Sequence, residues 1–344
     1  HLINYCDGTE TGSGFSEPVI VGDEIILFNK DSGKLQRRKV NDCGLVSESA
    51  VLGGTISDDK LYYNNGKVYA YERASPGKFY SWSLAGLDGA AAQEVGLVQQ
   101  GIGNIPVLAN DRLYYIGNDG GFYSYLADDL QLDFADASGG FSSACLGSDV
   151  SKAAVVDGGV YFAVCNSGGE NKVVAYDVGT RGIVWTEMGG IYSDTNNPIN
   201  VISAGGGKIC VQTSSFDNPN FGIIDQIDGF LSFNSLVGSD VIGFTIIHNG
   251  YCYVNTRSSG NLLNSKNINT GTPSQSAIGT ASGNSYFFPV KTGPSRVIYL
   301  ATNNPQSGAG QIASVSYDAS GTPAAAATSG SGALLSSPQR FISF

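Results

Sequence analysis

Side chains that could carry acid-base, nucleophilic or metal chemistry are few in this chain. It has two histidines, His1 and His248, among 344 residues, so a histidine general base or a catalytic triad has little material. We expect His248 to lie in a turn and to face solvent. Three carboxylate pairs are close in sequence: Asp128 with Asp129, Asp133 with Asp136, and Asp225 with Asp228. Such pairs could serve glycoside chemistry, but each lies at or beside an expected hairpin turn, where Asp serves the backbone.

Metal and thiol chemistry is similarly limited. Asp225 and Asp228 could supply oxygen ligands to a structural calcium ion, although they lack the EF-hand pattern; we expect no other cofactor. The six cysteines are widely spaced and form no CxxC motif, which favours disulfides and an oxidising compartment. Buried free thiols in a reducing compartment are the alternative. Pairing of sequence neighbours would join Cys6 to Cys43, Cys145 to Cys165, and Cys210 to Cys252.

Residues suited to a neutral ligand gather in two of the long loops that the sequence predicts. The expected long loops span residues 81–104, 138–152, 187–200, 213–220 and 303–310. Asparagine, aspartate and aromatic side chains suit sugars, whose hydroxyls need hydrogen-bond partners and whose CH faces pack on rings. The predicted ligand-binding residues are Tyr192, Asn196, Asn197, Phe216, Asp217, Asn218 and Asn220.

Composition narrows the class of protein. The net charge is -11, and only 14% of the residues are charged. A negative average field repels phosphate backbones, so we expect no nucleic acid partner. The sequence lacks an apolar run near the roughly 20 residues of a membrane span, so we expect none. Its 47 glycines, 18 tyrosines and 16 phenylalanines favour strands and turns over helices.

A strand-turn-strand unit recurs along the whole chain and must position these residues. One copy spans residues 106–115, with a turn at Asn110-Asp111. The last turn residues of the seven copies are Asp23, Asp59, Asp111, Gly159, Gly207, Gly250 and Ser295, which gives steps of 36, 52, 48, 48, 43 and 45 residues. A period of about 45 residues is typical of a β-propeller with four strands per blade. The sequence therefore predicts one all-β domain over residues 1–344, a seven-bladed propeller of four-stranded antiparallel blades.

The first copy is short, with 36 residues to the next anchor, and we expect it to lack one strand. Strand-like segments at the two ends, Leu2–Tyr5 and Arg340–Phe344, could supply the missing strand and close the ring. The same segments could instead pair with another copy of the chain, which would allow self-assembly. The basic run Lys34–Lys39 is interpreted as a charged edge strand that resists pairing.

One stretch, Val160–Trp185, is similar to the repeat of the PQQ-like propellers. It has a strand, a glycine-containing turn, the strand end Ala175-Tyr176-Asp177, the Thr180-Arg181-Gly182 turn and Trp185. Trp82 is the only other tryptophan. The resemblance implies the propeller fold and little about activity. Quinoprotein dehydrogenases of that superfamily use adjacent cysteines, which this chain lacks.

We expect an extracellular, non-catalytic propeller that binds carbohydrate or protein, or that packs into a surface assembly. The chain begins at His1 without Met, as expected if a secretory leader has been removed. We therefore expect a secreted protein, extracellular or at the cell surface, with the periplasm as a further setting. The alternative is a secreted glycoside hydrolase or lyase that uses loop carboxylates.

Overall fold

The structure is a computed structural model. It describes residues 16, 19–39, 44–57, 60–73, 76–97, 102–136, 150–167, 170–186, 199–213, 220–236, 241–256, 262–277, 286–293, 297–303, 309–324, 327–328 and 332–333. Within these ranges the regular elements are β-strands, and no helix occurs. None of the described residues form a helix long and apolar enough to cross a membrane.

The strands form six four-stranded sheets and one five-stranded sheet, each built from neighbours in chain order. The first three sheets contain β1 (Val19–Val21), β2 (Glu24–Asn29), β3 (Lys34–Lys39), β4 (Leu45–Glu48), β5 (Tyr62–Asn64), β6 (Lys67–Glu72), β7 (Lys78–Ser83), β8 (Gln93–Gly96), β9 (Val107–Ala109), β10 (Arg112–Ile116), β11 (Phe122–Leu126) and β12 (Leu132–Asp136).

The next two contain β13 (Val150–Asp157), β14 (Val160–Ser167), β15 (Glu170–Asp177), β16 (Gly182–Thr186), β17 (Ile199–Gly205), β18 (Lys208–Thr213), β19 (Asn220–Asp225) and β20 (Leu231–Leu236). The last two contain β21 (Val241–His248), β22 (Tyr251–Thr256), β23 (Leu262–Asn267), β24 (Pro273–Ala277), β25 (Tyr286–Gly293), β26 (Val297–Asn303), β27 (Ala309–Ser316), β28 (Ala327–Thr328) and β29 (Gly332–Ala333). Both β28 and β29 pair with β27.

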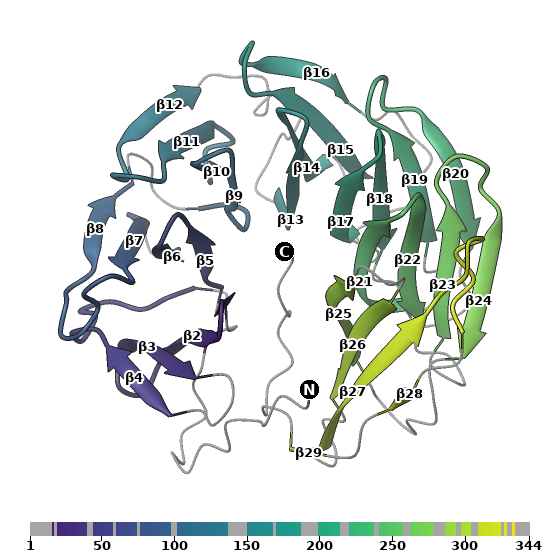
Figure 1. Ribbon diagram of the computed structural model, residues 1–344. Coiled ribbons are helices and arrows are strands. Elements are labelled where there is room, and N and C mark those ends of the chain that lie inside the picture. The colour runs from purple at the N-terminus through teal and green to yellow at the C-terminus, as the bar shows by residue number, and fades with distance from the viewer. Residues whose placement is uncertain are drawn as a thin grey trace.

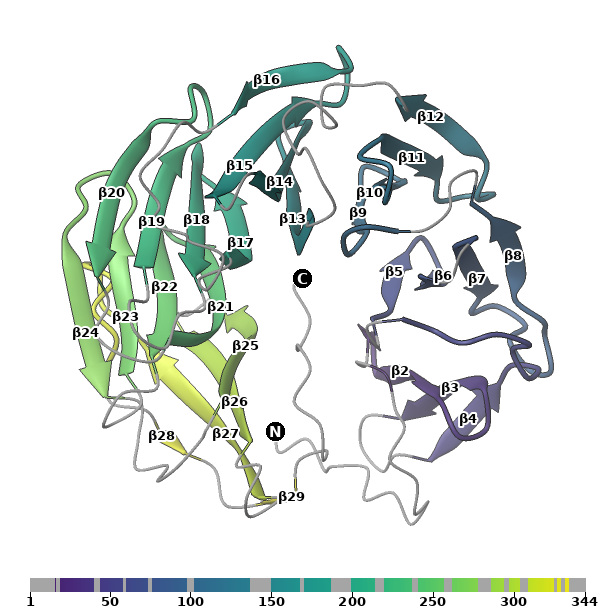
Figure 2. The same cartoon turned by 180° about the vertical axis from the view of Figure 1, so that it is seen from behind.

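The sheets are arranged around a common centre (Figures 1 and 2). First strands such as β13 and β17 lie innermost, and fourth strands such as β16 and β20 lie outermost. Neighbouring sheets pack through their first strands, β9 on β13, β13 on β17, β17 on β21 and β21 on β25. An all-β, propeller-type arrangement is thus confirmed.

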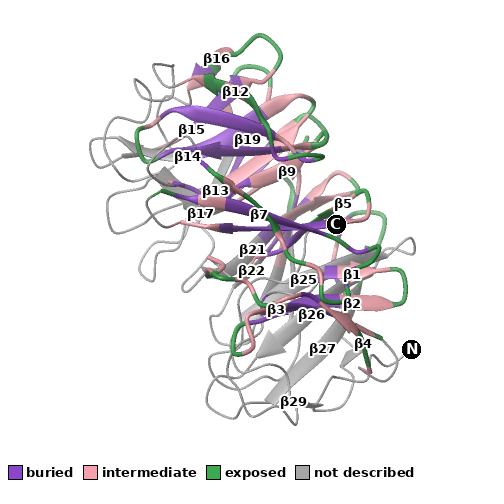
Figure 3. Cartoon of the chain, turned by 90° about the vertical axis from the view of Figure 1, so that its left-hand side faces the viewer, coloured by how far each residue is buried: buried purple, intermediate pink, exposed green. Residues whose placement is uncertain are grey.

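The hydrophobic core lies between neighbouring sheets. Consecutive residues of a central strand enter opposite interfaces: Tyr115 packs toward the β5–β8 sheet, whereas Tyr114 packs toward the β13–β16 sheet. Because each central strand is covered on both faces, its burial is continuous, as the purple central strands in Figure 3 show. The prediction that the tyrosine and phenylalanine stripes are core is confirmed for Tyr123, Tyr125 and Tyr176, all at most 1% exposed.

The second repeat begins later than the sequence suggested. Its first hairpin turn is Asn65-Gly66, between β5 and β6, and not Asp58-Asp59. Residues 55–57 are not a strand. The prediction was wrong because acidic turn-formers precede the true hairpin, whose Asn-Gly pair adopts the positive φ of a type I′ turn. With Gly66 in place of Asp59, the first two steps become 43 and 45 residues.

The first repeat is also complete. Residues 31–33 form the turn between β2 and β3, and β4 follows as the fourth strand. The expectation of a missing strand was wrong, because the short first step came from placing the second anchor at Asp59 and not at the true turn residue, Gly66. The segments Leu2–Tyr5 and Arg340–Phe344 lie outside the described residues.

The basic strand Lys34–Lys39 is β3, the third of four strands, and so is not an edge. Its cations are neutralised within the sheet: Arg37 donates to Glu24 at 2.8 and 2.7 Å, and Lys34 pairs with Glu48. Opposite charges on paired strands stabilise a sheet, so this run serves cohesion within the sheet. The expected loop 81–104 likewise contains the end of β7 and all of β8.

One hydrogen bond recurs at the same end of the sheets. The N–H of the first residue after the third strand donates to the last residue of the first hairpin turn. The pairs are Leu84 to Gly66, Ala127 to Asp111, Val178 to Gly159, Gln226 to Gly207 and Ile268 to Gly250, at 2.9 to 3.1 Å. The first and third hairpin turns of a sheet therefore lie together, and we call this end of the molecule the turn end. The opposite end carries the other connections and is called the loop end.

Candidate functional site

The predicted sugar-binding residues belong to two loops, 187–200 and 213–220. Tyr192, Asn196, Asn197, Phe216, Asp217 and Asn218 lie outside the described residues, as does most of loop 138–152. The strand ends that flank the two loops are described: Ile199 pairs with Thr213, and Asn220 begins β19 beside them. Loop 213–220 thus starts and finishes at the loop end of the β17–β20 sheet, whereas loop 187–200 runs from the end of β16, in the neighbouring sheet, to the start of β17.

The other predicted site lies at the turn end of the same sheet. Asp225 is the last residue of β19, and residues 226–230 form the turn to β20. The carboxylate of Asp225 accepts from the backbone N–H of Ile227 at 2.9 Å, and that of Asp228 accepts from Phe230 N–H at 2.9 Å. The N–H of Gly229 donates to the Asp225 carbonyl, which closes the turn. Both carboxylates therefore serve the backbone of their own turn.

Asp225 also forms an ion pair with Lys208 of β18. The Lys208 hydrogen bond, followed by that of Ile227 N–H, holds the pKa of Asp225 below its ordinary value. Among the described residues, no group of three or more His, Cys, Asp or Glu side chains could hold a metal ion. The calcium site stays a prediction, and its two proposed ligands already have hydrogen-bond partners.

Two side chains tie this turn to the neighbouring sheet. Trp185 of β16 donates its indole N–H to the Gln226 carbonyl at 2.8 Å, and its ring lies against Gly229. The side chain of Gln226 donates to Asp157 of β13 at 2.9 Å and to the Lys208 carbonyl at 3.0 Å. Both contacts therefore hold the turn to the β13–β16 sheet. Trp82 has no such role, because it lies on a third strand, β7, in the core.

The remaining carboxylate pairs are also occupied by structural contacts. Asp133 accepts from Arg112 at 2.9 Å within its own sheet, whereas Asp136 accepts from Tyr176 of the next sheet at 3.3 Å. These two carboxylates therefore have partners in different sheets. Asp129 accepts from Gln131 N–H at 3.0 Å within the third turn of its sheet, and Asp128 lies 4.0 Å from the Lys67 ammonium.

His248 differs from its expected position. It is the last residue of β21, is half-buried, and its ring lies edge-on to Tyr317 at 5.8 Å between centroids. Its Nε2 is buried without a hydrogen-bond partner in the described part of the chain. Burial lowers the pKa of His248 below its ordinary value. The expectation of a solvent-facing residue was wrong, because the last turn of the next repeat, from Tyr317 onward, covers it.

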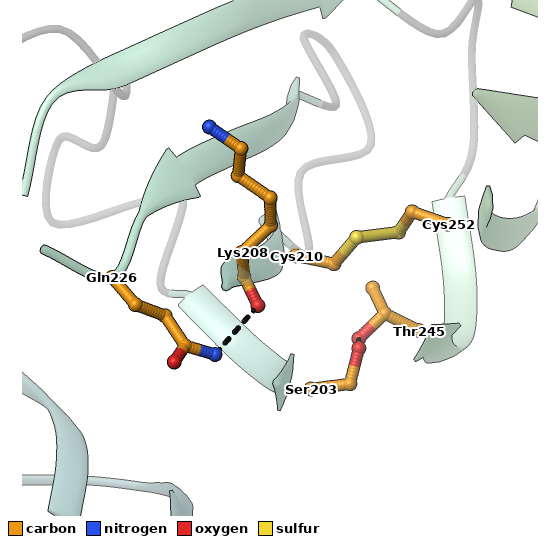
Figure 4. The surroundings of a disulfide bond; sticks show 6 residues. All are labelled: Ser203, Lys208, Cys210, Gln226, Thr245 and Cys252. Atoms are coloured by element: carbon orange, nitrogen blue, oxygen red, sulfur yellow. Dashed lines mark hydrogen bonds between the residues drawn. A yellow bond between two sulfur atoms is a disulfide. The ribbon is translucent and has the colours of Figure 1, made fainter. Parts of the chain in front are cut away.

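Cys210 and Cys252 form a disulfide between the second strands of neighbouring sheets, β18 and β22, which confirms that pairing (Figure 4). Both residues are fully buried. Ser203 of β17 and Thr245 of β21 join the same two sheets by a hydroxyl hydrogen bond of 2.9 Å. The side chain of Cys165 and all of Cys6, Cys43 and Cys145 lie outside what the structure describes.

Sequence reasoning missed two apolar side chains on the 226–230 turn. Ile227 is 83% exposed and Phe230 is 69% exposed. An apolar residue beside an expected strand is ordinarily assigned to the core, so composition carried no sign of their exposure. Only the repeat alignment, which places both on a hairpin turn, could have indicated it.

No protein-family model and no curated protein sequence matches the chain. Among solved structures, it resembles the computationally designed Ika8 protein (TM-score 0.65, 13% identity, covering 92% of this chain and 87% of that one). It also resembles BamB from Moraxella catarrhalis (TM-score 0.58, 14% identity, covering 91% of this chain and 87% of that one). A third similar structure is KlHsv2 with loop 6CD replaced by a Gly-Ser linker (TM-score 0.61, 9% identity, covering 93% of this chain and 99% of that one). At these identities the likeness concerns the fold alone, and the chain has a β-propeller-type fold.

Proposed function

We propose that this protein is an extracellular, non-catalytic propeller that binds carbohydrate or protein, or that packs into a surface assembly. The observation that carries the proposal is the set of contacts made by the three carboxylate pairs. In the described part of the chain, these carboxylates cap turns or contact Lys208, Arg112, Lys67 and Tyr176. A general acid or nucleophile must instead face a substrate.

The ligand would bind at the loop end of the β17–β20 sheet. Loops on a rigid scaffold commonly carry binding residues in such folds. The seven residues predicted from the sequence belong to loops that leave this end, and their amide and aromatic groups suit neutral sugars.

A glycan array with the purified protein tests this proposal. We expect binding to neutral glycans without turnover, and at least tenfold weaker binding after Tyr192→Ala or Phe216→Ala. Asp129→Asn is the control, because it changes a carboxylate at the turn end. Polysaccharide cleavage that is abolished by one Asp→Asn change would contradict the non-catalytic proposal and favour the hydrolase or lyase.

We also propose that the repeats form a closed, seven-bladed ring. The corrected spacing of the first repeats supports the regular count. The apolar terminal segments Leu2–Tyr5 and Arg340–Phe344 would pair where the β1–β4 and β25–β29 sheets meet. In an assembly, the same segments would pair between copies.

A further inference from the structure

The turn between β19 and β20 presents the most exposed large apolar side chains of the described chain. Ile227 is 83% exposed and Phe230 is 69% exposed, whereas the next, Val51, is 65% exposed. Single exposed apolar residues need no explanation. Two of them within four residues on one turn tip are a different case, because together they form an apolar surface.

The geometry of this turn does not require apolar residues. The same closing hydrogen bond, from the residue that ends the third strand to the carbonyl five residues later, occurs in four sheets. It joins Asp225 to Phe230, Leu126 to Gln131, Asn267 to Thr272 and Lys39 to Gly44. At the positions of Ile227 and Phe230, two of the other turns carry Asp128 with Gln131 and Asn269 with Thr272. Polar side chains thus serve the same turn elsewhere in the chain.

The tip is rigid. Gly229 N–H and the two capping carboxylates fix its backbone, and Trp185 and Gln226 fix it to the β13–β16 sheet. A preorganised apolar tip loses little conformational entropy on binding, and buried apolar anchors contribute most of the affinity in protein interfaces.

The turn end as a whole is acidic. Among the described residues of the first and third hairpin turns, Arg181 is the one cation. The exposed carboxylates on these turns are Asp228, on the tip itself, and Asp23, Asp88, Asp111, Asp128, Asp129 and Asp318, on turns of other sheets. A field of this sign attracts basic surfaces and repels anionic membranes and nucleic acids.

We propose that the turn end is a protein-docking surface, with Ile227 and Phe230 as anchors for a partner segment in which Lys and Arg side chains flank one or two large apolar ones. The acidic turns attract the basic side chains of this segment, and Ile227 and Phe230 pack against its apolar side chains. The proposal is independent of any glycan at the loop end, because the two ends carry different residues.

A displayed library of random 12-residue peptides, panned against the purified protein, tests the proposal. The probes are the enriched peptides, synthesised and measured by calorimetry. We expect basic peptides with one or two large apolar residues, and at least tenfold weaker binding to the Ile227→Asn/Phe230→Thr double variant, which copies the turn of the β21–β24 sheet. Affinity should also fall as salt is raised, because screening weakens the attraction.

Two control variants make the result decisive. Val51→Thr changes an exposed apolar residue at the loop end, beside the turn between β2 and β3, and should leave binding within twofold of the parent protein. Asp228→Asn keeps a carbonyl oxygen for the turn cap but removes a charge, and should weaken binding two- to fivefold at low salt. Thermal unfolding within about 2 °C of the parent would show that the double variant is folded. Enriched peptides that are neutral or acidic, or that bind the double variant equally well, would overturn the proposal.

Discussion

Gly229 allows a close packing contact between two neighbouring sheets. Its φ of +72° lies in the left-handed region, and a Cβ built on it would lie 2.5 Å from Cε3 of Trp185. Gly207, at the first turn of the same sheet, has φ +75° but no atom within 4 Å of a built Cβ. The two glycines therefore share the backbone requirement and differ in the packing requirement.

Gly229→Ala should destabilise the protein more than Gly207→Ala does. Both substitutions place a side chain in the left-handed region, at a cost of about 1 kcal/mol. Only the first also forces Trp185 away, which adds roughly 1–3 kcal/mol of overpacking. Urea unfolding of both variants measures the difference, and equal destabilisation would show that the Trp185 contact carries no energy.

His248 should make stability depend on pH. Since burial lowers its pKa in the folded protein below the ordinary 6.5, the unfolded chain binds the proton more readily. Its contribution is then fully present above pH 6.5 and is lost as the pH falls below that value. Urea midpoints at pH 7.5 and 5.0 measure this loss. His248→Gln should reduce the difference between the two midpoints. An unchanged difference in that variant would assign the pH dependence to other groups.

At the scale of elements, the Cys210–Cys252 bond links two sheets that otherwise meet through packing and the Ser203–Thr245 hydrogen bond. The cysteines are 42 residues apart in sequence, with Cα atoms 6.4 Å apart. For a loop of that length, the chain-entropy model gives about 4 kcal/mol of stabilisation. We therefore expect the bond to couple the stability of two neighbouring repeats.

The Cys210→Ala/Cys252→Ala double variant should lose up to about 4 kcal/mol of unfolding free energy. Denaturant unfolding without reductant makes the comparison, because the other cysteines then stay as they are in both proteins. A loss under 0.5 kcal/mol would mean that packing alone couples the two sheets.

The elements also show what the sequence could predict. Turn dipeptides such as Asn249-Gly250 and Gly158-Gly159 located the first hairpins, because their positive φ demands particular residues. Asp58-Asp59 misled because carboxylates favour many kinds of turn. Exposure was harder to predict, since Phe230 on a turn is exposed and Phe122 on a strand is buried, although the two side chains are chemically identical. The Trp185–Gln226 contact joins residues 41 apart in sequence, and no local pattern encodes it.

For the whole molecule, the arrangement of sheets depends on how the ring is completed. Each described sheet is built from one continuous stretch of chain, and no described strand pairs the β1–β4 sheet with the β25–β29 sheet. Interfaces between neighbouring sheets bury tyrosines, tryptophan and aliphatic residues on both faces of the central strands. The two end sheets each have a neighbour in sequence on one side only, so an uncompleted ring would leave one outer face of each without that cover.

Pairing of the chain ends should appear as coupling between them. A head variant replaces the apolar residues of 2–5 with Ser, a tail variant does the same for 341–344, and a third carries both changes. If the segments pair, each single variant should lower the melting temperature by several degrees. The double variant should lower it by less than the sum, because either change alone already breaks the contact. Additive losses of melting temperature would show that the ends act separately. If the losses are coupled and light scattering shows that the variants dissociate an oligomer, the segments pair between copies of the chain.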